Sequence, residues 1–106
     1  MAFTSVCKTN YLLEGDWAPF IVAGEPIMLV WPDGDRPRAY QGLCPHEDAT
    51  LESGIFNGRL ITCTAHGWVF DSRTGKGLSP PGWELEQYPL RIEDGWIQVD
   101  MEMVLE

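Results

Sequence analysis

The sequence is short of cysteine, of basic residues and of long apolar runs, and each shortage argues against a class of protein. Its 3 cysteines cannot all pair, so a secreted disulfide framework is not expected and a reducing cytoplasm is. No stretch approaches about 18 uninterrupted apolar residues, which predicts no membrane span. The first residues lack a basic start followed by an apolar run, so we also expect no signal peptide.

Basic residues are outnumbered by acidic ones along the whole chain. There are 7 lysines and arginines against 16 aspartates and glutamates, a formal net charge of −9. Such a surface repels nucleic acid and anionic lipid, so neither is an expected partner. We expect a monomer that meets proteins with basic docking surfaces, although acidity that serves only solubility would give the same composition.

Sustained helical periodicity is also missing, and the 106 residues are expected to form a single domain, 1–106. Short apolar runs between glycine, proline and Asp-Gly steps predict an all-β fold, an antiparallel β-sandwich. Turn chemistry predicts hairpins at residues 32–35, at Asn57-Gly58 and at Asp94-Gly95. The expected strands are 3–7, 17–22, 26–31, 38–42, 55–56, 59–62, 69–71, 87–93 and 96–100.

Irregular segments between these strands hold the residues with metal-binding chemistry. Residues 43–53 and 64–68 are predicted to be loops that approach each other, and the proline-stiffened stretch 75–82 is predicted to cover them. Together they define a small cluster-binding subdomain of loops at about residues 43–82. The tail after Asp100 is expected to fray.

Two short motifs in these loops pair one cysteine with one histidine each. They are Cys44-Pro45-His46 and Cys63-Thr64-Ala65-His66. Two thiolates and two imidazoles are the ligand set of a Rieske [2Fe–2S] cluster, in which histidines hold one iron and cysteines the other. A structural zinc site accepts the same residues, but zinc motifs usually pair cysteine with cysteine and histidine with histidine.

The neutral imidazoles set the electrical character of such a site. With two thiolates instead of four, reduction adds charge to a less negative cluster, so Rieske potentials lie at about −150 to +300 mV. High-potential Rieske proteins add a disulfide between the loops and follow the second histidine with Gly-Ser-x-Tyr. Here Gly67-Trp68-Val69-Phe70 lacks both hydroxyls, which predicts the low end of the range, about −150 mV.

The other candidate residues carry less functional signal. Cys7 is expected to be a small buried residue of the first strand. Among the tryptophans, Trp68 is placed near the cluster, whereas Trp17, Trp31, Trp83 and Trp96 are expected to pack in the core or at strand edges. No nucleophile motif, phosphate loop or isolated acid–base pair is present, which predicts that the chain is not an enzyme by itself.

The motifs and their flanks resemble a known family over nearly the whole chain. The segments AYQGLCPHE at 39–47 and GRLITCTAHGWVF at 58–70, with Thr74-Gly75 and Tyr88-Pro89-Leu90, are similar to soluble bacterial Rieske-type ferredoxins. More narrowly, they resemble the ferredoxin components of toluene and alkene, including isoprene, monooxygenases. The ferredoxin of an aromatic-ring-hydroxylating dioxygenase is the alternative, which the motifs alone do not separate.

The resemblance implies a cofactor, a fold and a pair of partners. Cys44 and Cys63 would bind one iron, and His46 and His66 the other. The chain would take electrons from an NADH-dependent flavin and iron–sulfur reductase and pass them to a di-iron hydroxylase. The implied fold is an antiparallel β-sandwich with a smaller subdomain that binds the cluster, and the implied location is the cytoplasm.

Overall fold

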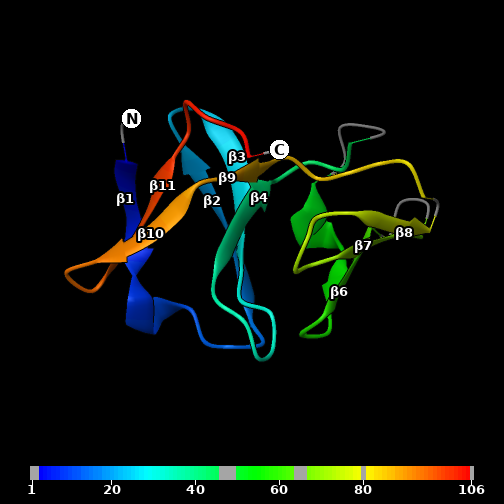
Figure 1. Ribbon diagram of the computed structural model, residues 1–106, viewed down its shortest axis with the longest axis horizontal. Helices are drawn as coiled ribbons and strands as arrows, with labels where there is room; N and C mark the ends of the chain where they lie inside the picture. Colours follow the sequence, from blue (N-terminus) through cyan, green and yellow to red (C-terminus); the bar gives the residue numbers. More distant parts are fainter. Residues whose placement is uncertain (1–2, 46–49, 64–66, 80, 106) are drawn as a thin grey trace.

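The structure is a computed structural model that describes residues 3–45, 50–63, 67–79 and 81–105. The strands of these residues form antiparallel sheets joined by short turns, which confirms the predicted all-β fold (Figure 1). The 3₁₀ turns η1 (Thr9–Tyr11) and η2 (Leu51–Ser53) lie between strands.

In the described residues, three sheets lie in a row along the long axis of the molecule (Figure 1). The first sheet has the order β1 (Phe3–Lys8), β11 (Trp96–Asp100), β10 (Leu90–Glu93). The second has the order β2 (Trp17–Val22), β3 (Glu25–Val30), β4 (Arg38–Gln41), β9 (Gln87–Tyr88). The third has the order β5 (Ile55–Phe56), β6 (Leu60–Cys63), β7 (Trp68–Asp71), β8 (Gly77–Ser79).

The second sheet separates two hydrophobic cores, because side chains of a strand alternate between its faces. In β3, Ile27 and Leu29 face one core while Met28 and Val30 face the other, and all four are buried. The first core, against the first sheet, comprises Cys7, Leu12, Val22, Ile27, Leu29, Ala39, Tyr88, Ile97 and Val99. The second core, against the third sheet, comprises Met28, Val30, Tyr40, Cys44, Leu51, Ile61, Cys63, Phe70 and Leu85.

The predicted turns occur where expected. Asp94 and Gly95 both have positive φ, 54° and 79°, as a tight turn between β10 and β11 requires. The side chain of Asn57 accepts hydrogen bonds from the Arg59 and Leu60 amides, which fixes the turn between β5 and β6. The segment at 32–35 joins β3 to β4 as predicted.

Three expectations about the second half of the chain are wrong. The single strand predicted at 87–93 is two, because Pro89 interrupts it: β9 pairs with β4, whereas β10 pairs with β11 in another sheet. The supposedly irregular stretch 75–82 contains β8, which pairs with β7 through a bulge. The tail does not simply fray, since the Leu105 amide donates to the Gln87 carbonyl at 2.7 Å.

Hydrogen bonds from the 32–35 turn tie the third sheet to the second. The Asp33 amide donates to the Gly58 carbonyl at 2.8 Å, and Arg73 Nη2 donates to the Asp33 carbonyl at 2.6 Å. The buried Tyr40 hydroxyl donates to the Ser72 carbonyl at 2.7 Å. These contacts hold the third sheet against the face of β3 and β4 that carries the second core.

Candidate functional site

Cys44 and Cys63 come together in the second core. Cys44 lies just beyond the end of β4, and Cys63 is the last residue of β6. Each is 2% exposed, and both belong to the same cluster of buried side chains. The structure therefore brings together the two thiols that the motifs predict to be ligands, although they are far apart in the chain.

The other half of the predicted ligand set lies outside the described residues. These residues are His46, in the segment 46–49, and His66, in the segment 64–66. Within the described segments, no group of three or more histidine, cysteine or acidic side chains could hold a metal ion.

Backbone contacts fix the loop that carries Cys44. The Gly42 amide donates to the Pro26 carbonyl at 3.0 Å, and the Leu51 amide donates to the Gly42 carbonyl at 2.8 Å. A Cβ at Gly42 would lie only 2.9 Å from the Pro26 carbonyl carbon, so the close approach of the loop to β3 requires glycine. The loop closes where Leu43 and Thr50 form a β-bridge.

Gln41 braces the same loop, a role that the sequence analysis missed. Its side-chain Nε2 donates to the Leu43 carbonyl at 2.7 Å, and its Oε1 accepts from the Glu86 amide at 2.7 Å. The side chain thus links the Cys44 loop to the strand region before β9. No local sequence signal identifies it, because Glu86 is 45 positions away.

The surroundings of the two thiols are apolar. Phe70 is fully buried in the same core, and its position opposite Ile61 puts it two pairs along the β6–β7 ladder from Cys63. Tyr40 is also fully buried, but its hydroxyl donates to Ser72. Burial is the main cause that raises the pKa of Tyr40 far above its ordinary value, so this phenol is neutral.

This donor set fits an iron–sulfur cluster. Thiolates are soft, negative ligands that iron–sulfur clusters use, and two of them buried in an apolar core need a cation as partner. Cys7 does not join them: it is 8% exposed in the first core, as expected of a small buried residue, and burial raises the pKa of its thiol. None of the three cysteines forms a disulfide.

The tryptophans divide into packed and exposed ones. Trp17 packs against Phe56 with ring centroids 5.6 Å apart, and Trp31 packs against the first core, as predicted. Trp83 and Trp96 are 44% and 38% exposed, so neither lies in a core, but Trp96 begins β11 and packs under Lys8, which fits the strand-edge alternative. The Trp83 ring lies against Trp68, with centroids 5.3 Å apart, and Trp68 is directly opposite Cys63 in the β6–β7 pair.

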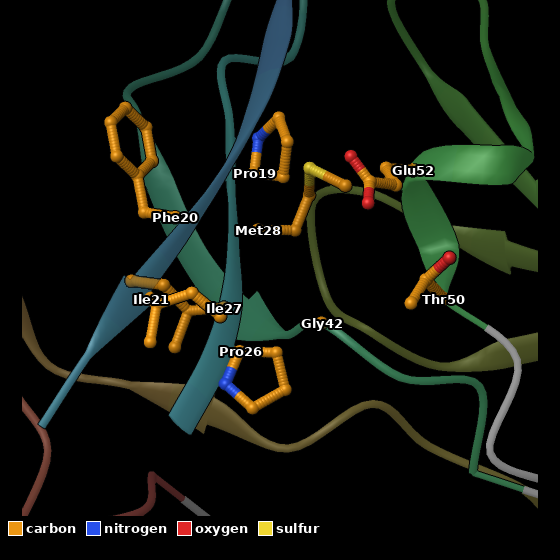
Figure 2. A pocket seen from close by; sticks show the side chains of 9 residues that line it. All are labelled: Pro19, Phe20, Ile21, Pro26, Ile27, Met28, Gly42, Thr50 and Glu52. Atoms are coloured by element: carbon orange, nitrogen blue, oxygen red, sulfur yellow. The ribbon is translucent and has the colours of Figure 1, made fainter. Parts of the chain in front are cut away.

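In the described part of the chain, one surface hollow lies beside the loop that carries Cys44 and another lies at β8. Figure 2 shows the first, about 320 Å³, where the β2–β3 hairpin meets η2 beside the loop that carries Cys44. Pro19, Ile21, Pro26 and Met28 line it on the hairpin side, and Thr50 and Glu52 line it opposite. The second, about 290 Å³, is lined by Lys76, Gly77, Pro81, Gly82, Trp83 and Glu84.

Comparison with known proteins places the sequence among ferredoxins. Residues 2–89 match the family described as the Rieske [2Fe-2S] domain. The chain is 32% identical over 101 residues to the ferredoxin component of the alkene monooxygenase system of Xanthobacter autotrophicus, covering 94% of this chain and 82% of that one. It is 34% identical over 91 residues to the ferredoxin component of the naphthalene 1,2-dioxygenase system of Pseudomonas putida, covering 85% and 86%.

A solved structure has the same fold. It is a chain from the complex of reduced oxygenase and oxidised ferredoxin in carbazole 1,9a-dioxygenase, matched with a TM-score of 0.85 at 27% identity. The match covers 98% of this chain and 97% of that one. In the segments that the structure describes, no helix has the length and apolar character needed to span a membrane.

Proposed function

The chain belongs to the family of Rieske [2Fe-2S] domains, and from that premise we propose that it is the ferredoxin of a hydrocarbon oxygenase system. It carries a Rieske-type cluster and transfers electrons, and it is not itself an enzyme. The observation that carries the proposal is the pair of buried thiols, one from each Cys/His motif, in one apolar core. When bound, the cluster supplies a site that takes up and releases one electron at a time.

The proposed ligands are Cys44 and Cys63 for one iron and His46 and His66 for the other. The burial of both thiols in the second core supports the cysteine half. The histidine half rests on the motif spacing alone. The proposed domain is the whole chain, with residues 43–82 as the part that binds the cluster.

The proposed partners are an NADH-dependent flavin and iron–sulfur reductase and a terminal oxygenase. A di-iron monooxygenase hydroxylase is the first candidate, because one relative serves an alkene monooxygenase system. A ring-hydroxylating dioxygenase is the second, because other relatives at similar identity serve such systems. Docking to the oxygenase is brief, as a carrier that alternates between two partners requires, and the protein acts as a monomer in the cytoplasm.

The ligand proposal is tested by cluster content. Cys44→Ser and Cys63→Ser should each abolish the bound cluster, because either change removes a thiolate ligand. Cys7→Ser is the matched control, since Cys7 lies in the other core, and it should retain the cluster. The measurements are iron and inorganic sulfide per chain, the visible spectrum, and the EPR signal after reduction. Colourless wild-type protein that binds one zinc would support a structural zinc site instead.

The partner proposal is tested by reconstitution. The wild-type protein, NADH and a reductase are combined with the oxygenase of the Xanthobacter autotrophicus alkene monooxygenase system or of the Pseudomonas putida naphthalene dioxygenase system. We expect ferredoxin-dependent oxidation of substrate, faster with the monooxygenase. Turnover only with the dioxygenase would reverse the order of the candidates, and turnover with neither would reject the function.

A further inference from the structure

Trp83 is an exposed aromatic residue on a segment that hydrogen bonds hold in place. The Gly77 amide donates to the Trp83 carbonyl at 2.6 Å, and Lys76 and Glu84 form a β-bridge. Leu85, which follows Glu84 in the chain, is buried in the second core, and its amide donates to the Gly75 carbonyl at 2.8 Å. The indole is nevertheless 44% exposed, so its surface stays open to solvent on a fixed backbone.

One contact connects this indole to the buried thiols. The rings of Trp83 and Trp68 are 5.3 Å apart with an angle of 53° between their planes. Trp68 packs against the second core and is the β-pair partner of Cys63. The exposed face of Trp83 is thus separated from a proposed cluster ligand by one side chain.

We propose that Trp83 is the residue through which this ferredoxin holds its terminal oxygenase at the third sheet, an inference that rests on the proposed function. Tryptophan is enriched among the residues that dominate binding energy in protein interfaces, because a large rigid ring buries much area at little entropic cost. An electron carrier gains from placing such a residue near its cofactor, since the partner must approach closely before an electron is transferred.

The hollow beside Trp83 indicates the chemistry of the partner. The hollow has a volume of about 290 Å³, and Pro81, Gly82 and the Trp83 indole form an apolar part of its lining. This part of the lining suits an apolar side chain of the partner. Lys76 and Glu84 are both exposed and line the hollow with opposite charges, so the electrostatic preference comes from the net charge of −9 on the chain as a whole. The partner surface that fits is therefore an apolar side chain on a predominantly basic surface.

The competing role for Trp83 is to shield Trp68 and the thiols from water. Shielding predicts that removal of the indole changes the reduction potential or the retention of the cluster. Docking predicts that removal changes the affinity for the partner and leaves the cluster unchanged. The two roles therefore differ in their readout.

The experiment compares Trp83→Ala and Trp83→Phe with the wild-type protein, using whichever of the two oxygenases the wild type supports better. Trp83→Ala should raise the KM for the ferredoxin roughly tenfold or more, with kcat near the wild-type value. Trp83→Phe should restore much of the affinity, because it keeps an aromatic ring at the site. The Kd between the oxidised ferredoxin and the oxygenase, measured without NADH, should rise by the same factor.

Trp96→Ala is the matched control. Trp96 is 38% exposed but lies on the β10–β11 hairpin, at the other end of the molecule from β8 (Figure 1), so its loss should leave KM and Kd unchanged. Unchanged KM and Kd in Trp83→Ala would overturn the inference, as would a shifted potential or a lost cluster in that variant. If the wild-type protein supports neither oxygenase, the proposed function itself fails. That result is seen with the wild-type protein alone, so it is distinct from a failure of the Trp83 inference, which is seen only when the variants are compared with the wild type.

Discussion

Burial gives the three cysteine thiols different chemistry. Cys7 lies in the first core, where burial raises the pKa of its thiol. The thiol of Cys7 therefore stays neutral. Cys44 and Cys63 share the second core, where two thiolates together would be unstable without a cation. Cysteine therefore serves as a packed core side chain at one position and as a proposed metal ligand at two others.

Phe70 is the residue at which the reduction potential can be tested. Phe70 is fully buried in the same core as the two thiols. It occupies the position that is tyrosine in the Gly-Ser-x-Tyr motif of high-potential Rieske proteins. Phe70→Tyr should raise the midpoint potential from its expected value of about −150 mV, because a hydroxyl near the sulfurs stabilises the reduced state. A redox titration followed by the visible spectrum measures the change.

Tyr40→Phe is the control for Phe70→Tyr. It removes a buried hydroxyl whose hydrogen bond goes to the Ser72 carbonyl, so it should lower stability without raising the potential. An unaltered potential in Phe70→Tyr protein with a full cluster would contradict the hydroxyl argument.

Among the elements, the short turn η2 matters most for the geometry of the site. Leu51 of η2 is fully buried in the second core, and the Gly54 amide after it donates to the Leu51 carbonyl at 2.8 Å. A Cβ at Gly54 would overlap the carbonyl oxygen of Thr62, which precedes Cys63 in β6. Glycine at this position therefore lets η2 lie directly against the strand that ends in a proposed ligand.

Gly54→Ala should lower the free energy of unfolding by about 1–3 kcal/mol, as expected when an extra methyl group is forced into a packed site. It should also weaken cluster retention, because β6 must shift. Gly24→Ala is the control: Gly24 has a φ of 79° but open space around it, so only backbone strain of about 1–2 kcal/mol applies. Urea unfolding and iron content over time measure both effects, and equal cluster loss in the two variants would argue against the packing explanation.

For the whole molecule, the two cores predict unequal dependence on the cofactor. Metal binding contributes to folding energy, and the proposed cysteine ligands lie in the second core only. Removing the cluster should speed amide exchange in β5–β8 and leave β1, β10 and β11 protected. Hydrogen exchange followed by mass spectrometry on the two forms measures this, and a uniform loss of protection would show that the cores unfold as one unit.

The net charge of the whole molecule affects how fast it meets its partner. With a charge of −9, the protein should be steered towards a basic partner surface, and added salt screens that attraction over about 10 Å at 0.1 M. The second-order rate of electron transfer to the oxygenase should therefore fall as KCl is raised from low to physiological concentration. Stopped-flow mixing measures the rate, and the midpoint potential at each salt concentration is the control for effects on the cluster. A salt-independent rate would mean that acidity serves only solubility.

The sequence by itself determined the fold class, the cofactor and most of the turns, because these depend on local chemistry. The Asp94-Gly95 turn depends on only two adjacent residues. The thiol and imidazole groups of a Cys/His motif can likewise be read from a few neighbouring residues. Most strand bounds agreed within one residue for the same reason, since alternation and turn residues are read locally.

Only the tertiary structure decided which distant segments meet. Pairing of β9 with β4 and of β10 with β11 depends on partners far along the chain, so Pro89 could not be identified in advance as the boundary between two sheets. The brace from Gln41 and the contact between Trp83 and Trp68 have the same origin. Burial and exposure are properties of surfaces brought together by folding, and the exposed indole of Trp83 could therefore be recognised only in three dimensions.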